Sequence, residues 1–383
     1  MTKYNYADSR RLPADASPLA GHYYTDPAIL QEEVEKIFQS MWTCAGREDE
    51  IPEPGDYITR QIGNANVIIV RGEDRKVRAF YNNCRHRGTR ICSEPSGRVK
   101  GSFQCPYHAW TYGLDGQLIG APHMAEVENF DKSKFPLAGV GCDVWAGHIF
   151  FNLDPNRKPL WEQLEKMPKI MERFNLGDLR RAGRHAYDIK ANWKLIVENY
   201  SECYHCPLIH PQLNRVTNYL NGGNDAMGAN FNGGFQIIGD QFSTLTVKGK
   251  KTRPYFKGIT KDDQKRVYYY VIYPNLLLSV HPDYLMTHTL WPKEPGVTYV
   301  VCEWHFDPEV MKRSDFDPSD AVGFWDMTNK QDWHVCEISQ LGVASKGYIP
   351  GPFTHQEELL YEFDRFVLDR LAGRTNRKPA LAS

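Results

Sequence analysis

The sequence predicts an α+β protein: a β-rich domain followed by a domain of helices and antiparallel sheet. Three observations lead to this fold class. Short strand-like runs such as DYITRQIG and ANVIIVRG, separated by turn residues, begin near residue 43 and end with GHIFFNLDP. Alternating runs rich in β-branched and aromatic residues fill positions 266–306, as expected for an antiparallel sheet. Helical patterns occupy the remaining apolar segments: 27–42, 324–342 and 354–373.

We expect three segments along the chain. Residues 1–42 should form a helical segment that packs with the C-terminal domain, residues 43–155 the β-rich domain, and residues 156–383 the C-terminal domain. Within the last of these, residues 155–190 are expected to form a polar connector with at least one helix. Residues 213–264 are rich in Asn and Gly and are expected to form loops over a site.

Composition narrows the classes of partner and compartment. The 383 residues contain 46 Lys and Arg against 47 Asp and Glu, so neither nucleic acid nor an anionic membrane is expected as a partner. The polar N-terminal stretch does not resemble a signal peptide, and no run of about 18 apolar residues predicts a transmembrane helix. Nine cysteines in such a chain favour a cytoplasmic protein in which disulfides are not expected and thiols are available to a metal.

The segment NWKLIVENYSECYHCPLIHP, residues 192–211, combines a helical pattern with residue types that bind metals. Its apolar residues recur at three- and four-residue steps, as on a buried helix face. Pro207 and Pro211 should end or distort that helix, which lets His205 and His210 point to one metal ion. Ordinary core histidines are the non-functional alternative. Two neighbouring thiols keep a zinc site open as well: Cys203 and Cys206.

A second set of ligand types lies in the β-rich domain. Cys84-Arg85-His86 and Cys105-Pro106-Tyr107-His108 are separated by 18 residues and flanked by Gly and Pro, so each pair is expected in a tight turn. Four such ligands suit either a structural zinc ion or a Rieske [2Fe–2S] cluster, which takes two Cys on one iron and two His on the other. One Cys and one His in each loop favours the cluster, because each loop then supplies both irons.

The motif NNCRHRGTRIC…FQCPYHAWTY resembles the Rieske domain of Rieske non-haem iron oxygenase α subunits of the ring-hydroxylating type. The resemblance implies that Cys84 and Cys105 hold one iron and that His86 and His108 hold the other. Respiratory Rieske proteins carry an additional disulfide between these loops. Tyr107 stands where the second of those cysteines would be, which implies a lower-potential cluster of the oxygenase type.

The segment ENYSECYHCPLIH is similar to the part of that family that binds a mononuclear iron. The resemblance implies His205 and His210 as ligands of Fe(II), with open positions left for O2. It further implies a carboxylate from the helix at 324–342, for which we favour Asp332. The rival carboxylates on the same helix are Asp326 and Glu337.

Two more residues receive a role from the resemblance. Glu202 matches the carboxylate that, in the trimers of this family, connects a cluster histidine of one subunit to an iron histidine of the next. The implied connection runs from His108 of a neighbouring subunit to His205. Asn199, one helical turn before the ligands, is expected to support the iron site.

Together these resemblances imply the terminal oxygenase component of a homotrimeric enzyme. Its cofactors would be a [2Fe–2S] Rieske cluster and Fe(II), with O2 as co-substrate. Since no G-x-G-x-x-G opens a βαβ unit, NAD(P)H should act through a separate reductase, directly or through a ferredoxin. The phrase NYSECYHCPLIHP is most similar to quaternary-amine monooxygenases acting on glycine betaine, choline or carnitine, which implies hydroxylation or oxidative N-dealkylation of a small amine. The alternatives are mono- or dioxygenation of an aromatic or N-alkyl xenobiotic compound, an electron carrier without oxygenase activity, and a zinc-stabilised binding protein.

Overall fold

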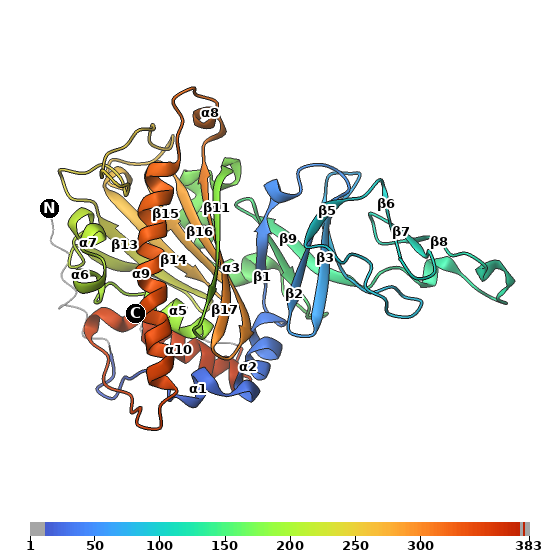
Figure 1. The fold of residues 1–383 in the computed structure, drawn as a ribbon, viewed down its shortest axis with the longest axis horizontal. Coiled ribbons are helices and arrows are strands. Elements are labelled where there is room, and N and C mark those ends of the chain that lie inside the picture. The colour runs from blue at the N-terminus through green and yellow to red at the C-terminus, as the bar shows by residue number, and fades with distance from the viewer. Residues whose placement is uncertain (1–11, 376–377, 380–383) are drawn as a thin grey trace. The chain divides into compact units, whose positions relative to one another are not determined.

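The computed structural model describes residues 12–375 and 378–379. Contacts between residues divide the chain into two compact units. One unit is Phe38–Leu160, and the other is Trp161–Ser383 together with the residues up to Ile37. Each unit is built on its own seven-stranded antiparallel sheet, drawn in Figure 1, and the α+β class is confirmed.

The unit Phe38–Leu160 contains the short strands that alternation predicts. Its large sheet has the order β1-β10-β9-β4-β3-β2-β5. A separate three-stranded sheet, β6-β7-β8, follows in the chain. The strands are β1 (Thr43–Arg47), β2 (Asp56–Ile62), β3 (Ala65–Arg71), β4 (Val77–Tyr81), β5 (Ser96–Arg98), β6 (Ser102–Gln104), β7 (Thr111–Gly113), β8 (Leu118–Gly120), β9 (Gly139–Trp145) and β10 (His148–Asn152).

The sheet of the other unit has the order β11-β17-β16-β15-β14-β13-β12. The four strands expected between residues 266 and 306 are confirmed as its central part. In Figure 1 the long helix α9 runs across one face of this sheet. The strands are β11 (Arg180–Ile189), β12 (Gly222–Met227), β13 (Phe231–Ile237), β14 (Arg266–Ile272), β15 (Leu276–Val280), β16 (Leu285–Glu294) and β17 (Val297–Phe306).

Three strands of that sheet lie where the sequence predicted a connector or loops. β11 falls in the expected connector, and its polar residues fit a strand at the sheet edge with one face in water. β12 and β13 fall in the segment expected to be loops. Glycine weakens a strand unless another backbone approaches closely. Such an approach exists here, because a Cβ on Gly233 would collide with the Tyr269 carbonyl oxygen and one on Gly234 with the Gly223 carbonyl oxygen.

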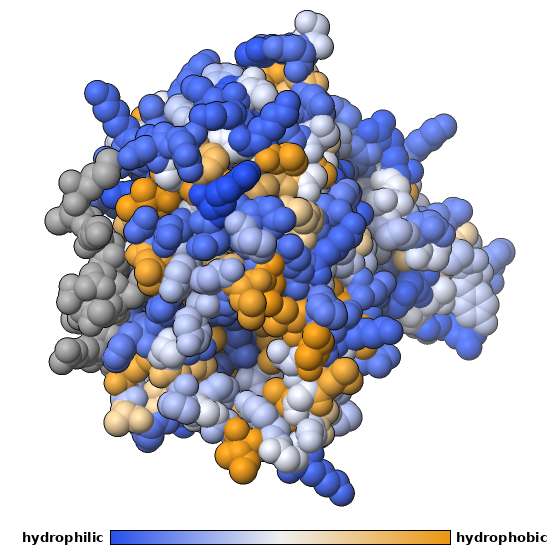
Figure 2. Space-filling view, turned by 60° about the vertical axis from the view of Figure 1, so that its left-hand side comes forward, coloured by the Kyte–Doolittle hydropathy of each residue, from blue (hydrophilic) through white to orange (hydrophobic). Residues whose placement is uncertain are grey.

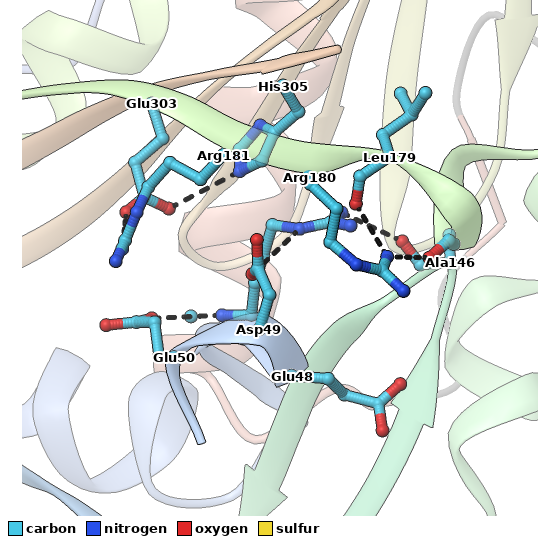
Figure 3. A network of polar contacts seen from close by, with 12 residues as sticks. Glu48, Asp49, Glu50, Ala146, Leu179, Arg180, Arg181, Glu303 and His305 are labelled. Atoms are coloured by element: carbon cyan, nitrogen blue, oxygen red, sulfur yellow. Dashed lines mark hydrogen bonds and ion pairs between the residues drawn. The ribbon is translucent and has the colours of Figure 1, made fainter. Parts of the chain in front are cut away.

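A charged pair joins the neighbouring strands β11 and β17. Figure 3 shows Arg181 directed at Glu303, with Nη1 donating to Oε1 at 2.6 Å. Glu303 is buried, and His305 lies on its other side, 3.8 Å from the carboxylate. Since a buried carboxylate needs partners, these contacts fix the pairing of the two strands at this end.

Helices cover the sheet of this unit. The helix expected over residues 27–42 is shorter, because α2 passes into a π-helical turn at Val34–Phe38 and the chain then leads into β1. The helix expected at 324–342 is confirmed and extends further on its N-terminal side. The helices are α1 (His22–Thr25), α2 (Pro27–Glu33), α3 (Leu160–Leu164), α4 (Met167–Met171), α5 (Trp193–Tyr200), α6 (Cys206–Ile209), α7 (Pro211–Val216), α8 (Pro308–Met311), α9 (Ser319–Val343) and α10 (Glu358–Leu371).

A buried ion pair anchors α5 to α2. The Lys194 ammonium donates to Glu33 Oε1 at 2.6 Å, and both side chains are 0% exposed. The Trp193 indole N–H donates to the other oxygen of Glu33 at 2.7 Å. Burial lowers the pKa of Lys194, and attraction to Glu33 opposes that shift. Each charge therefore depends on the other, since an isolated ion here would be very costly.

Among the described residues, none of the helices has the length and apolar character needed to cross a membrane. The face shown in Figure 2 is largely hydrophilic, and its hydrophobic side chains gather in separate groups. Single exposed apolar side chains are normal on a folded domain.

Candidate active site

The two loops expected to hold a cluster have the same backbone structure. In the first loop the Cys84 N–H donates to Thr89 and the Cys84 carbonyl accepts from Gly88. In the second loop Cys105 makes the equivalent bonds, to Trp110 and from Ala109. Gly88 and Ala109, each four residues after its cysteine, both have positive φ, which makes the tight return possible.

These loops bring the four predicted ligands together. Both cysteines are buried and the two histidines are exposed. The rings of His86 and His108 lie 4.7 Å apart, and the Trp110 indole stacks on His86 at 4.9 Å. Burial raises the pKa of the Cys84 thiol, which the Tyr112 hydroxyl approaches to 3.3 Å. Buried sulfur ligands with exposed imidazoles are suited to a cluster that exchanges electrons at the surface.

The spacing of these four ligands distinguishes between a single zinc ion and a [2Fe–2S] cluster. Around one zinc ion, with bonds of about 2.0–2.3 Å, all ligand atoms would lie within about 4 Å of each other. Among the described residues, no three of these four ligands have all their ligand atoms within 4.8 Å. A cluster of two irons requires that wider spacing, so the site fits a [2Fe–2S] group better than a single zinc.

We expect His86→Ala to abolish the visible absorption of the cluster, because one iron loses half of its protein ligands. The mononuclear iron should remain, since its candidate ligands lie in the other unit. Absorption spectra and iron analysis of the purified protein check this. Tyr107→Phe, which alters an exposed neighbour of His108, is the control and should keep the cluster. Retention of a full cluster in His86→Ala would contradict the assignment.

The second candidate metal site lies between the segment that contains α6 and helix α9. The chain leaves α5 at Tyr200, and His205 and His210 flank the short helix α6. Pro207 and Pro211 stand in the first turns of α6 and α7, where a missing N–H has no cost. The prolines thus start two short helices after a break that has already occurred, and this differs from the predicted interruption of one helix.

The structure brings His205, His210 and Asp332 together. Asp332 Oδ1 lies 2.7 Å from His210 Nε2 and 3.5 Å from His205 Nε2. Within residues 12–375 and 378–379, this is the one group of three or more His, Cys, Asp or Glu whose ligand atoms all lie within 4.8 Å. Two imidazoles and one carboxylate on one side of an ion is the donor set of non-haem Fe(II) oxygenases.

The outer nitrogens of both histidines have partners. His205 Nδ1 lies 2.5 Å from Glu202 Oε1, and His210 Nδ1 lies 2.8 Å from Gln331 Oε1. Each contact favours a proton on Nδ1 and leaves Nε2 free for a metal. Gln331 was missed in the sequence, and its position beside Asp332 was the signal available.

Charge within the site also favours a cation. Burial lowers the pKa of His205, but hydrogen bonds to Asp332 and Glu202 outweigh burial and raise that pKa to about 10. Burial alone would raise the pKa of Asp332, yet its hydrogen bonds to His205 and His210 lower it. The site without metal therefore holds a proton on His205, which a metal ion must displace on binding.

The rival carboxylates are engaged elsewhere. Asp326 accepts from Tyr187 at 2.9 Å and from Lys330 at 2.6 Å. Glu337 accepts from the backbone N–H of Lys190 at 3.1 Å. Of the three candidates on α9, Asp332 is therefore the one that reaches the two histidines.

Cys203 and Cys206 form a disulfide beside His205, so the expectation that the chain has no disulfides is wrong, and so is a zinc site that uses both thiols. Both sulfurs are consumed by this bond, so neither belongs to a metal donor set here. The expectation failed because a three-residue separation in a turn brings the two side chains together without any long-range contact.

A cavity opens beside the metal site. Its volume is about 970 Å³ including the part open to solvent. Asn199 and Glu202 line it with the three candidate ligands. Its other walls come from the sheet, from α5 and α9 and from the segment after α7, and they include six aromatic side chains: Tyr200, Tyr219, Phe235, Tyr269, Trp325 and Trp333.

Two family models match this chain, one within each of the two units described above. The Rieske [2Fe-2S] domain matches residues 41–131, and the ring hydroxylating alpha subunit (catalytic domain) matches residues 176–373, more than half of the chain. The chain belongs to the ring hydroxylating alpha subunit family. It is a Rieske-type non-haem iron oxygenase that uses O2 and electrons from a reductase.

Named relatives of this chain align with most of it or with about half of it. The glycine betaine monooxygenase oxygenase subunit of Pseudomonas aeruginosa (strain UCBPP-PA14) is 29% identical over 380 residues, 92% of this chain and 88% of its own. The carnitine monooxygenase oxygenase subunit of Acinetobacter pittii (strain PHEA-2) is 42% identical over 194 residues, 49% of this chain and 51% of its own. A solved quaternary ammonium Rieske monooxygenase is 26% identical, with a TM-score of 0.78 over 95% of this chain and 99% of that one.

Proposed function

We propose that this oxygenase hydroxylates or oxidatively N-demethylates a quaternary or N-methyl amine. The observation that carries the proposal is an aromatic cavity joined to the group of His205, His210 and Asp332. The relatives named for glycine betaine and carnitine support the same substrate class. Oxygenation of an aromatic compound is the alternative, which an aromatic cavity alone does not exclude.

The aromatic rings form a connected wall suited to a cation. Tyr200 packs edge-on against Tyr269 at 6.0 Å and against His288 at 6.2 Å. Tyr269 in turn contacts Trp325 at 6.3 Å. A quaternary ammonium over such rings gains roughly 0.5–2 kcal/mol per good cation–π contact. An N-methyl group bound at this wall lies in the same cavity as the metal site.

We further propose the ligand roles that the geometry fits. Cys84, His86, Cys105 and His108 would hold the cluster, and His205, His210 and Asp332 the Fe(II). When bound, these groups store and deliver electrons and activate O2. Glu202 and Gln331 keep both histidine Nε2 atoms available.

We propose a homotrimer in which Glu202 connects His205 to His108 of a neighbouring subunit. His108 and Tyr107 are exposed, as is Tyr204 beside Glu202, whereas the Glu202 side chain is 12% exposed, so the connection would join an exposed histidine to a partly covered carboxylate at the surface. The description of the solved relative refers to inter-subunit electron transfer in that protein. We also propose a cytoplasmic location, which the seven free cysteines of the described chain favour. The electrons would come from a separate reductase.

Glu202→Gln should slow transfer of an electron between the two centres by roughly 10- to 100-fold, the usual effect of losing an outer partner of a ligand. The amide keeps the size of the side chain and removes its charge. Single-turnover spectroscopy of the prereduced protein measures this rate. Glu202→Asp, which retains the carboxylate, should be less affected. Equal rates in the wild type and both variants would contradict the proposed role of Glu202 in electron transfer.

The proposed function is tested by NAD(P)H-linked oxygen uptake with a matching reductase. Quaternary amines and aromatic compounds are compared at equal concentration, and formaldehyde is measured alongside. We expect amine-dependent oxygen uptake, with formaldehyde formed in equal amount when an N-methyl group is attacked. Uptake with aromatic compounds alone would overturn the proposal.

A further inference from the structure

Three carboxyl groups and one ammonium group are enclosed together in the core beside α5. The carboxyl groups belong to Glu33 of α2, Glu198 of α5 and Asp364 of α10, and the ammonium belongs to Lys194 of α5. None of these four residues is more than 8% exposed. An uncompensated ion inside a protein is very costly, and one lysine cannot balance three carboxylates. The cluster must therefore retain at least one proton.

The contacts within the cluster indicate where that proton lies. Lys194 and Glu33 form the ion pair described above, which leaves Glu198 and Asp364. The Tyr24 hydroxyl donates to Glu198 Oε1 at 2.9 Å. Both oxygens of Asp364 are buried and receive no hydrogen bond from an N–H or O–H group of the described residues. They face the carboxyl group of Glu198 within hydrogen-bond reach, and such a bond forms only when one of the two groups is protonated.

Lys194 is the one cation among the described groups that act most strongly on this pair. The other titratable groups that face it from neighbouring elements are a carboxyl, a thiol and two phenols: Glu33 of α2, Cys336 of α9, Tyr24 of α1 and Tyr348 of the segment before α10. Burial raises the pKa of both Glu198 and Asp364 above the usual range of carboxyl groups. The pair therefore gives up its last proton at neutral or alkaline pH and not at acid pH.

The pair joins two helices whose ends form part of the cavity wall. α5 packs against α10, as Figure 1 shows. On α5, Glu198 directly precedes residues 199–203, which all line the cavity, and the same segment leads to His205. On α10, Asp364 lies about one and a half turns after Leu359, which lines the same cavity. A hydrogen bond between the two carboxyl groups therefore holds these two parts of the wall together.

We propose that Glu198 and Asp364 share one proton and act as positioning residues, whose hydrogen bond holds α5 against α10 and thereby keeps the segment with the iron ligands in place. When a base in the solvent removes this proton, two buried carboxylates face each other without a donor, and their repulsion separates the two helices at this point. The inference concerns the oxygenase itself and does not depend on which substrate it oxidises.

Asp364→Asn and Glu198→Gln test whether the proton is shared. Each amide keeps the size of the side chain and offers an N–H donor in place of the shared proton, so neither variant can lose that donor at high pH. Asp369→Asn is the matched control. Asp369 also lies on α10, but its carboxylate accepts from the Arg374 guanidinium at 2.8 Å and 2.6 Å and needs no proton.

Infrared difference spectra between the wild type and each variant detect the proton directly. They are recorded at about pH 8, where ordinary carboxyl groups are ionised. We expect the C=O absorption of a protonated carboxyl group to disappear in both Asp364→Asn and Glu198→Gln and to remain in Asp369→Asn. Loss in both variants indicates one shared proton, because a carboxyl group protonated by itself would keep its absorption when the other is replaced. An absorption kept in Glu198→Gln, or absent from the wild type, overturns the sharing.

The positioning role is measured by turnover and by mononuclear iron content as the pH is raised. We expect the ratio of wild-type to Asp364→Asn turnover to fall roughly tenfold between about pH 7 and about pH 9.5, because only the wild type loses the proton. The same reductase serves both proteins, so its own pH dependence cancels in this ratio. The wild type should also lose mononuclear iron over this range, while its [2Fe–2S] absorption, which belongs to the other unit, stays constant.

The outcomes separate this inference from the proposed function. A constant turnover ratio together with constant iron content overturns the positioning role, even if the infrared spectra confirm the shared proton. The infrared and iron measurements need no substrate, so they test the pair whether or not an amine is oxidised. Failure of every amine in the oxygen-uptake experiment overturns the proposed function alone.

Discussion

Asp332→Ala should abolish oxygen-dependent turnover and leave the absorption of the [2Fe–2S] cluster unchanged. The carboxylate is the one acidic side chain of α9 that approaches Nε2 of both His205 and His210. Its loss leaves two neutral donors, and we expect activity to fall by more than the roughly 100-fold effect of removing an outer partner. Steady-state rates and mononuclear iron content measure the outcome.

Asp326→Ala is the matched control for that experiment. Asp326 is also an acid of α9, but its carboxylate binds Lys330 and Tyr187. This variant should retain most of the activity and its mononuclear iron. If Asp326→Ala lost iron while Asp332→Ala kept it, the ligand assignment would be wrong.

Lys194→Met should lower the free energy of unfolding of the unit that contains Trp161–Ser383 by about 3–5 kcal/mol, the usual cost of removing one partner of a buried ion pair. The methionine fills much of the space, so the main loss is the charge that compensates Glu33. Denaturant unfolding followed by tryptophan fluorescence measures the effect, with absorption of the cluster as a separate signal for the other unit.

Two further variants show whether burial of the charge is the cause. Lys194→Met combined with Glu33→Gln removes both ions of this pair and should recover part of the lost stability, since Lys194 also attracts the buried carboxyls of Glu198 and Asp364. Lys312→Met breaks an exposed pair with Glu309, in which both side chains are 71% exposed, and should cost less than about 1 kcal/mol. Equal losses in both single variants would contradict an effect of burial.

Local patterns were enough to predict the loops around Cys84 and Cys105. Each loop takes its shape from backbone bonds four and five residues apart, so ligand spacing in the sequence carries over to the structure. The strands between residues 266 and 306 were predictable for a similar reason, because alternation is also a local signal.

Long-range relations were not available from local patterns. Asp332 lies 122 residues from His210, so only the family resemblance points to it, and Gln331 is signalled only by its place directly before Asp332. The Asn- and Gly-rich sequence of β12 and β13 predicts loops, because glycine disfavours strands in general. Gly233 and Gly234 of β13 are required by the backbones of neighbouring strands, a requirement that appears only once the sheet has formed.

The glycines of β13 also restrict how the pocket of this enzyme can change during evolution. Gly233 and Gly234 form part of the cavity wall, and neither has room for even a methyl group. At these two positions the volume of the pocket therefore cannot be reduced by substitution. New substrate ranges must arise from lining positions that carry a side chain, such as Phe235 and Tyr269 of the sheet or Trp325 of α9.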